Sequence, residues 1–361
     1  MKKIISLCIA FMLITASVPF CRAAVYNGFV YTENDDGTYT VTEYRDFYED
    51  FVNIPAKING VNVTAIGSGA FQSKNNINTV RIPETVTSIG SMAFYGCKKL
   101  VSVIMGENVT SIGANAFNSC TSLTGINLKN VQIIGESAFY DCTYLTDLYM
   151  GEALKVIGRR AFHGCSALSY IKMSDALLYI GDYAFTNCTA VTSLHFPDLL
   201  GYIGNSAFKG CSALSEVTFG SGELEIGGYA FENCTSLTQI TVPDNVTSIG
   251  SYAFALRTPA STEFSHAVTI TCTSRSAALT YAKIYDVPVY ISDIQQSVSG
   301  FCDIDGNGTV ETADARLLLR IASDIVSLPD DAEFFMYDIN SNGVIDTEDA
   351  ILVLRKAADL I

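Results

Sequence analysis

The chain has 361 residues, of which 49% are hydrophobic and 16% charged, and its formal net charge is −15. This hydrophobic content suits two or more packed domains and excludes a wholly disordered chain. The strong negative charge argues against binding to nucleic acid or to an anionic membrane surface, because both attract basic proteins.

The N-terminus has the pattern of a secretory signal peptide. Two lysines precede an apolar run from Ile4 to Phe20, and the small residue Ala23 follows shortly after. A basic start, an apolar centre and a small residue at the cleavage site are typical of such peptides. We predict that residues 1–23 are removed after Ala23 and that the protein is exported; a retained membrane anchor is the alternative. No later stretch has the roughly 18 continuous apolar residues needed to span a bilayer.

Residues 24–62 are expected to form an N-terminal β-hairpin cap. They contain two alternating apolar and polar stretches on either side of Asp35-Asp36-Gly37. Alternation around an Asp-Gly turn is typical of a β-hairpin. Such a hairpin would cover the apolar end of the repeats that follow.

A repeat of 22 or 23 residues fills residues 63–254. Each copy has an Ile-Gly pair followed by an Ala-Phe pair, and most copies add a cysteine. The nine Ile-Gly pairs begin at Ile66, Ile89, Ile112, Ile134, Ile157, Ile180, Ile203, Ile226 and Ile249. Self-similarity at this period predicts a solenoid of stacked units, each burying its apolar face against its neighbours.

Two short elements are expected in each copy. The copies end in an alternating segment such as LTQITV at residues 237–242, which predicts a short strand. The preceding G-x-x-A-F-x-x-C segment is too short for an independent helix, and its spacing suits a short helical turn. Over residues 58–254 the pattern resembles the BspA-like bacterial leucine-rich repeats. That resemblance implies a curved, extracellular solenoid that binds ligands and does not turn over substrates.

The seven repeat cysteines share one position: Cys97, Cys120, Cys142, Cys165, Cys188, Cys211 and Cys234. Neighbouring copies would place them about 4.8 Å apart, one strand spacing. Parallel Cβ directions do not give the torsion of a disulfide. We interpret these cysteines as small buried hydrophobic residues, with disulfides as the alternative.

Strand alternation also identifies the outward residues. If Leu148 and Met150 point inward, then Asp147 and Tyr149 point outward, and this register carries through the stack. The central copies gather an aromatic and basic group on that face: Tyr149, Tyr170, Lys172 and His195. We predict that these four residues bind a ligand. The alternative is that tyrosine simply suits a strand surface.

A C-terminal cap is expected over residues 255–291. The stretch VTITCTS predicts a last strand, a helix should run from about Ser276 to Asp286, and VPVYI predicts another strand. The polar residues 292–300 would then form a linker to the last domain.

Residues 301–361 contain two copies of a calcium-loop pattern and thirteen acidic residues against four basic ones. A 12-residue calcium loop offers oxygen ligands at positions 1, 3, 5, 7, 9 and 12 and turns at a glycine in position 6. The predicted ligands are Asp303, Asp305, Asn307, Thr309, Glu311 and Asp314 in the first loop, and Asp338, Asn340, Asn342, Val344, Asp346 and Asp349 in the second. The pattern therefore predicts two calcium ions.

These loops differ from ordinary EF-hands, because position 12 is Asp and no helix is expected before Asp303. In both respects residues 301–361 resemble the type I dockerin. That resemblance implies a small all-α module with two EF-hand-like calcium loops that binds a cohesin of a cellulosomal scaffoldin. The residues that it implies face the cohesin are Thr312, Ala313, Leu319, Arg320, Thr347, Glu348, Leu354 and Arg355.

Two functions follow from these parts. The first is a secreted, non-catalytic binding protein on a cell-surface cellulosome, whose solenoid binds a protein or polysaccharide ligand. The alternative is a dockerin-bearing enzyme of polysaccharide catabolism, such as a glycoside hydrolase. A glycosidase needs two carboxylates about 5–10 Å apart, and no such pair stands out in the repeats. We therefore predict no catalytic residues.

Overall fold

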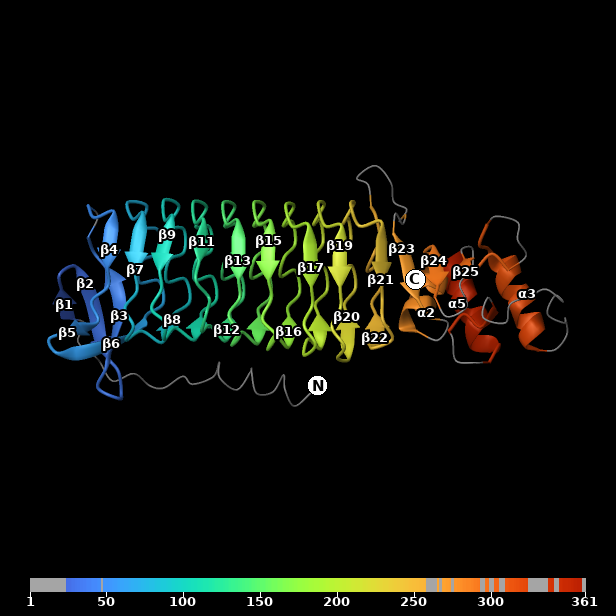
Figure 1. Cartoon of the computed structure of the whole chain (residues 1–361), viewed down its shortest axis with the longest axis horizontal. Coiled ribbons are helices and arrows are strands. Elements are labelled where there is room, and N and C mark those ends of the chain that lie inside the picture. Colours follow the sequence, from blue (N-terminus) through green and yellow to red (C-terminus); the bar gives the residue numbers. More distant parts are fainter. Residues whose placement is uncertain are drawn as a thin grey trace.

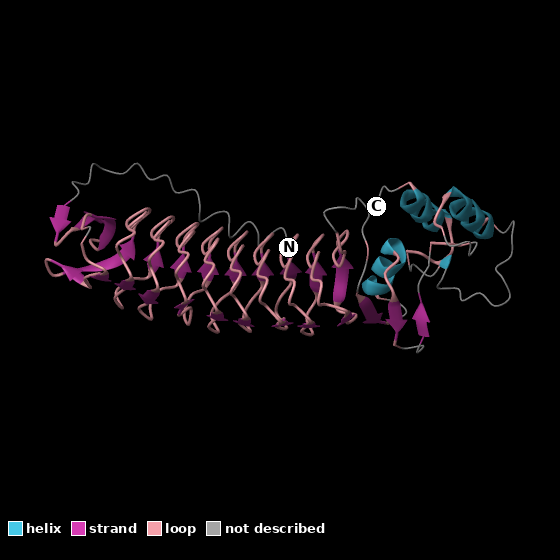
Figure 2. Cartoon of the chain, turned by 90° about the horizontal axis from the view of Figure 1, so that it is seen from above, coloured by secondary structure: helices cyan, strands magenta, loops and turns pink. Residues whose placement is uncertain are grey.

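The computed structural model describes residues 24–46, 48–257, 265, 268–273, 276–292, 296–298, 302–304, 309–323, 337–340 and 344–358. The predicted signal peptide, residues 1–23, lies outside the described residues. A long row of stacked turns ends in a group of helices at the C-terminal side (Figures 1 and 2).

The N-terminal cap forms as a β-hairpin. Strands β2 (Phe29–Glu33) and β3 (Tyr39–Tyr44) pair antiparallel, and β1 (Ala24–Tyr26) pairs with β2. Strand β3 then pairs in parallel with β6 (Val61–Ile66), which also pairs with β5 (Lys57–Ile58). The hairpin therefore continues the sheet of the repeats and covers its first strand.

The repeats stack two rows of strands, which lie above and below one another in Figure 1. The first row, which we call the Ile-Gly sheet, is a continuous parallel run of β6, β8 (Ser88–Ile89), β10 (Ser111–Ile112), β12 (Ile133–Ile134), β14 (Val156–Ile157), β16 (Tyr179–Ile180), β18 (Tyr202–Ile203), β20 (Leu224–Ile226) and β22 (Val246–Ile249). The second row consists of β4 (Phe51–Asn53), β7 (Thr79–Arg81), β9 (Ser102–Ile104), β11 (Gly125–Ile126), β13 (Asp147–Tyr149), β15 (Tyr170–Lys172), β17 (Ser193–His195), β19 (Glu216–Thr218) and β21 (Gln239–Thr241). The sequence predicted the second row only. Because β4 pairs with β7, that row starts before residue 63.

The glycine of each Ile-Gly pair is required by the close approach of neighbouring turns. A Cβ atom added at Gly113 would lie 2.6 Å from the backbone nitrogen of Ser91. Any larger residue would push two turns apart, so this glycine sets the tight spacing of the Ile-Gly sheet.

The prediction of a helical turn in each copy is wrong. The Ala-Phe segments form tight turns, and no helix occurs in described residues 48–257. Two residues of a turn adopt left-handed backbone angles, as Asn115 (φ 57°) and Ser119 (φ 60°) do. Left-handed residues end a right-handed helix. Backbone hydrogen bonds close each turn, as from Asn118 N to Asn115 O at 3.2 Å, and others link one turn to the next, as from Phe94 N to Ala116 O at 2.7 Å.

A column of stacked phenylalanine rings fills the centre of the solenoid: Phe71, Phe94, Phe117, Phe139, Phe162, Phe185, Phe208, Phe231 and Phe254. Neighbouring ring centroids are 4.9 to 5.5 Å apart and the rings are inclined by at most 12°. All nine rings are buried. Aromatic stacking adds to the burial of apolar area, so this column is the main core of the fold.

The cysteine column lies beside it, and its interpretation as buried thiols is confirmed. All seven cysteines are free and buried, so the disulfide alternative is wrong. Each Sγ donates a hydrogen bond to the carbonyl of a phenylalanine in the preceding turn, at 3.0 to 3.3 Å. Burial raises the pKa of Cys97 to about 12. The sequence did not indicate this bond, which is a second hydrogen bond to a carbonyl that already accepts a backbone N–H within its own turn, as Phe94 O does from Cys97 N at 3.2 Å.

The C-terminal cap contains β23 (Thr269–Cys272), α2 (Ala277–Tyr285) and β24 (Val289–Ile291), as predicted. The N-terminus of α2 is capped by Ser276, whose Oγ accepts from Leu279 N at 3.2 Å. Part of the predicted linker 292–300 is instead strand β25 (Gln296–Val298), which pairs with β24. The cap covers the last turn of the repeats.

Helices α3 (Thr312–Ala322) and α5 (Thr347–Ala357) pack against each other in the C-terminal module. Their small core includes Leu318 and Val353, both fully buried, together with Ile339. Figure 2 shows these two helices side by side at the far end of the row of turns. The part of residues 301–361 that the structure describes thus contains the two helices expected after the loops.

Candidate functional site

The strand alternation places the predicted ligand residues on one face of the second strand row. Tyr149 and Tyr170 are 59% and 46% exposed. Their ring centroids are 5.4 Å apart, so the rings form one tilted aromatic surface. Tyr149 lies beside Lys172 in the register of β13 and β15. We call Tyr149, Tyr170, Lys172 and His195 the tyrosine patch.

His195 extends the patch over β17. Its Nδ1 lies 2.7 Å from the hydroxyl oxygen of Thr218 on the next strand, and this contact orients the imidazole. Exposed rings and two basic side chains can stack against a ligand and hydrogen-bond to it. The patch can therefore bind a ligand, and these residue types suit more than one class of ligand.

The same face lacks the carboxylate pair of a glycosidase. Its outward acids are Asp147 and Glu216, which stand three strands apart in the row. Three strand spacings amount to about 14 Å, whereas glycosidase carboxylates lie about 5–10 Å apart. These two acids cannot share one glycosidic bond.

His163 and Cys165 do not form a catalytic pair. The Cys165 thiol belongs to the core column, where it donates to Phe139 O at 3.2 Å, and burial raises its pKa. The His163 ring stacks on Tyr140 with centroids 4.8 Å apart. Burial also lowers the pKa of His163. A buried, protonated thiol is inert as a nucleophile.

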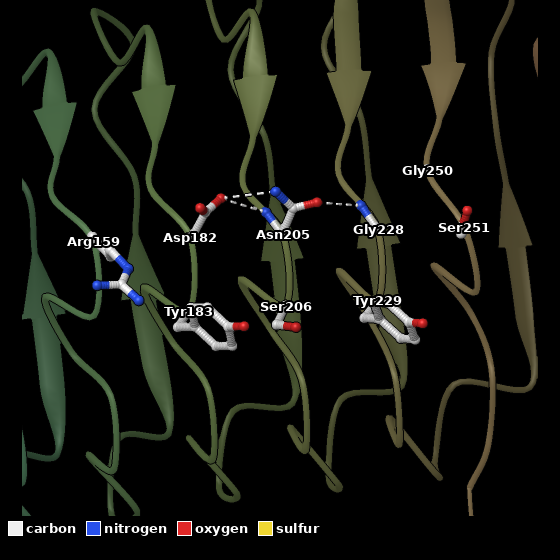
Figure 3. A pocket seen from close by; sticks show the side chains of 9 residues that line it. All are labelled: Arg159, Asp182, Tyr183, Asn205, Ser206, Gly228, Tyr229, Gly250 and Ser251. Carbon is white, nitrogen blue, oxygen red and sulfur yellow. Dashed lines mark hydrogen bonds between the residues drawn. The ribbon is translucent and has the colours of Figure 1, made fainter.

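An open groove, which the sequence did not indicate, lies at the turns that follow β14 to β22 (Figure 3). Its volume is about 570 Å³, and it is lined by Arg159, Asp182, Tyr183, Asn205, Ser206, Gly228, Tyr229, Gly250 and Ser251. Asp182 Oδ1 accepts hydrogen bonds from the backbone and side-chain nitrogens of Asn205, at 2.8 and 3.2 Å. Asn205 Oδ1 accepts in turn from Gly228 N at 2.8 Å. This chain of bonds, drawn in Figure 3, fixes the polar side of the groove.

The two predicted calcium loops are only partly described. Asp305, Asn307 and Asn342 lie outside the described residues. No group of three or more His, Cys, Asp or Glu side chains able to hold a metal occurs in the part of the chain that the structure describes. The remaining predicted ligands lie at the start and end of each loop and on the first turn of the following helix.

Both loops have a similar arrangement at their last ligand, with a donor at loop position 2 in the first and at position 3 in the second. Asp314 is fully buried; its two oxygens accept from Ile304 N at 2.8 Å and from Glu311 N at 2.7 Å. In the second loop, Asp349 accepts from backbone nitrogens of Asn340 and Asp346, at 3.0 and 2.8 Å. Each carboxylate therefore ties the start of its loop to the end. Oxygen-rich loops closed in this way fit the ligand chemistry of calcium.

Burial raises the pKa of Asp349. A buried carboxylate is costly unless a positive charge or hydrogen bonds compensate it. The loops thus concentrate negative charge at points where a cation would compensate it.

All eight residues that the dockerin resemblance assigns to cohesin contact are exposed: Thr312, Ala313, Leu319, Arg320, Thr347, Glu348, Leu354 and Arg355. Leu319 is 43% and Leu354 is 45% exposed. The two leucines stand at matching positions of α3 and α5, so each copy exposes the same apolar side chain.

The cap helix α2 contacts the C-terminal module through Lys283, a residue that the sequence did not single out. Lys283 is buried, and its Nζ donates to the carbonyl of Asp338 in the second loop. Cys302 Sγ donates to Lys283 O at 3.1 Å. Burial lowers the pKa of Lys283 to about 8. Solenoid and module are therefore joined by a contact at the second predicted calcium loop.

Among the described residues, no helix has both the length and the apolar character needed to cross a membrane. A comparison with curated proteins gives no match.

Several solved structures are similar. A leucine-rich cell surface protein from Faecalibacterium prausnitzii is 29% identical, with a TM-score of 0.55; the match covers 67% of this chain and 75% of that one. A leucine-rich repeat protein from T. pallidum is 24% identical, with 60% and 91% covered and a TM-score of 0.46. One from Bacteroides ovatus is also 24% identical, with 72% and 86% covered and a TM-score of 0.38.

The model of the BspA type leucine-rich repeat region matches in six copies, over residues 64–192 and 155–277. These residues make up more than half of the chain, and they include the Ile-Gly sheet, the phenylalanine column and the tyrosine patch. The chain therefore belongs to the BspA-type leucine-rich repeat family.

Proposed function

We propose that this protein is a secreted, non-catalytic binding protein held on a cell-surface cellulosome by calcium-dependent binding of its dockerin-like module to a cohesin. Its solenoid binds a protein or polysaccharide ligand through the tyrosine patch. The observation that carries the proposal is the pairing of an exposed aromatic face with a module of two equivalent acidic loops. The similar Faecalibacterium prausnitzii protein is named a cell surface protein, and this supports an extracellular location for the present chain.

Calcium would be held by the twelve predicted loop ligands. The shared closure of both loops by Asp314 and Asp349 supports two ions over one. When bound, the cation compensates the loop carboxylates and fixes the helices that follow. Those helices present the exposed leucines Leu319 and Leu354 to the cohesin.

The enzyme alternative has little support. In the second strand row, Asp147 and Glu216 lie about 14 Å apart by strand spacing. Cys165, which lies close to His163 in the sequence, has its thiol in the core. Nucleophilic or acid–base catalysis needs groups within hydrogen-bond reach of each other.

Replacing Tyr149, Tyr170 and His195 together by serine is expected to abolish ligand binding by the solenoid. Interface residues of this kind contribute about 2 kcal/mol or more each, which for one residue is already about a 30-fold loss. The ligand is recovered by pull-down from plant cell wall, culture supernatant and host mucosa, and affinity is then measured by calorimetry.

The control carries Arg81→Ser, Gln239→Ser and Thr241→Ser on the same face outside the patch, and should bind normally. Circular dichroism checks that both variants fold. Unchanged affinity in the patch variant would move the site to another face.

The two copies of the module are expected to differ in cohesin binding. Ala313 in the first copy corresponds to Glu348 in the second, and an ionised glutamate buried at an interface without a cation is unfavourable. The variant Leu319→Asp/Arg320→Ala should therefore lose affinity for a cognate cohesin, whereas Leu354→Asp/Arg355→Ala should keep it. Equal tolerance of either pair, with loss only when both are changed, would show two docking orientations and contradict the preference.

A further inference from the structure

One position of the repeat, two residues after the Ile-Gly pair, forms a column of side chains along the solenoid. In the last five repeats the column reads Arg160, Tyr183, Ser206, Tyr229 and Tyr252. All five residues share a left-handed backbone, with φ between 55° and 59°. Hydrogen bonds keep the turns in register, from Tyr183 N to Asn205 O and from Ser206 N to Gly228 O, both at 2.8 Å.

The planar groups of this column stack on both sides of Ser206. The rings of Tyr229 and Tyr252 have centroids 5.6 Å apart, and Tyr252 meets Tyr285 of α2 at 5.0 Å. On the other side, the guanidinium carbon of Arg160 lies 5.4 Å from the ring centroid of Tyr183. Ser206 has no ring, so the column that the described residues form has a gap at this turn. Figure 3 shows Ser206 between the rings of Tyr183 and Tyr229, at the centre of the groove.

The gap has the size of one ring. Tyr183 and Tyr229 are two turns apart, which corresponds to about 10 Å. A flat ring halfway between them would lie about 5 Å from each centre. Neighbouring rings of the phenylalanine column stack at the same separation, 4.9 to 5.5 Å. A ligand ring in the gap would therefore contact an aromatic face on either side.

The rim of the gap is polar. Asp182 uses Oδ1 for both of its hydrogen bonds to Asn205, and its Oδ2 makes no hydrogen bond to any residue that the structure describes. The side chains of Arg159 and Ser251 complete the lining. A tyrosine or phenylalanine of a protein partner would stack equally well, but it offers at most one hydroxyl to Asp182, and Arg159 is already paired with Glu136 at 3.3 Å. A sugar ring offers apolar C–H faces for stacking and hydroxyls around its edge.

We propose that the gap between Tyr183 and Tyr229 binds one sugar ring of a neutral glycan. The two tyrosines stack on its faces, and Asp182 accepts hydrogen bonds from its hydroxyls. The site lies at the turns after the Ile-Gly sheet and uses no residue of the tyrosine patch. It goes beyond the proposed function and depends neither on that patch nor on the dockerin-like module.

The test screens the mature full-length protein on an array of neutral plant-cell-wall and mucin oligosaccharides, and the strongest binder is then titrated. Ser206→Tyr places a ring of the protein itself in the gap. It should lower the affinity for the oligosaccharide at least about tenfold, which is the effect expected when one ring can no longer stack. The variant should fold, because tyrosine stands at the same backbone conformation in Tyr183, Tyr229 and Tyr252. Tyr183→Ala and Tyr229→Ala should each weaken binding as well.

Ser137→Tyr is the matched control, since Ser137 occupies the same column position with φ 54° and lies outside the groove. It should bind like the unchanged protein. If no oligosaccharide binds, or if Ser206→Tyr and both alanine variants keep full affinity, the proposal is overturned. Binding of an aromatic peptide to the gap, with no oligosaccharide bound, would also overturn it. The results with the Ser206, Tyr183 and Tyr229 variants do not bear on cohesin binding or on the tyrosine patch, because these residues belong to neither.

Discussion

Replacing Phe162 by alanine is expected to lower the free energy of unfolding by about 3–5 kcal/mol. Phe162 is fully buried and stacks on Phe139 and Phe185, each at 5.1 Å. Its loss leaves a cavity in the middle of the column and removes two ring contacts. Because each turn of a solenoid is supported by its neighbours, a break in the middle should also reduce the cooperativity of unfolding. Urea unfolding followed by circular dichroism measures both effects.

Tyr144→Ala is the control, because it also deletes an aromatic ring but at a side chain that is 66% exposed. Its effect should stay within about 0.5 kcal/mol. A terminal variant, Phe71→Ala, should reduce cooperativity less than Phe162→Ala does. If Phe162→Ala costs under roughly 1 kcal/mol, as a surface substitution does, the phenylalanine column is not the main core.

Removal of calcium with EDTA is expected to unfold residues 301–361 and to leave the repeats folded. The fully buried carboxylates of Asp314 and Asp349 and the nearly buried Asp338 then lose the charge compensation that calcium would supply. Metal binding contributes directly to the folding free energy of such loops. The phenylalanine column contains no ligand and should not respond. Calorimetry should show one transition that EDTA moves to lower temperature and one that it leaves in place.

The double variant Asp303→Asn/Asp338→Asn removes a charged ligand from each loop and should lower the calcium affinity. Asp147→Asn, an exposed acid on β13, is the matched control and should leave the calcium dependence unchanged. An EDTA-insensitive transition for the module would mean that its loops fold without a cation.

The elements that follow a regular period could be predicted from the sequence. Alternation in the second strand row correctly placed Leu148 in the core and Tyr149 on the surface. The recurring phenylalanine and cysteine are both buried because neighbouring turns cover them. A signal that repeats at every copy is averaged over many copies, and this makes it reliable.

Other features depend on contacts between copies. The strands of the Ile-Gly sheet, such as Ser88–Ile89, are often only two residues long, too short for alternation to be visible. At the left-handed position two residues after the Ile-Gly pair, most copies have a residue other than glycine, such as Met92, so the residue type did not indicate this conformation. The gap at Ser206 has meaning only once the rings of Tyr183 and Tyr229 are known to stack along one axis. Aligning the copies would show the change from Tyr to Ser but not its geometry.

The C-terminal module also has some features that the sequence predicts and others that it does not. The spacing of oxygen-bearing residues predicts two calcium loops, because such a loop requires ligands at fixed positions, and this stays a prediction. The helices expected after the loops are present as α3 and α5. The contact of Lys283 with the carbonyl of Asp338 could not be predicted, because it joins elements far apart in the sequence. A lysine in a helix is ordinarily expected to face solvent.

The measurement that tests the central claim most directly is a calorimetric titration of the mature full-length protein with a type I cohesin, in calcium and in EDTA. We expect binding in calcium, loss of that binding in EDTA, and its return when calcium is restored. Loss of affinity in the Leu319→Asp/Arg320→Ala variant would place the contact on the exposed face of α3. Failure of type I cohesins to bind in calcium, with the module folded, would contradict the account, as would binding that EDTA leaves unchanged.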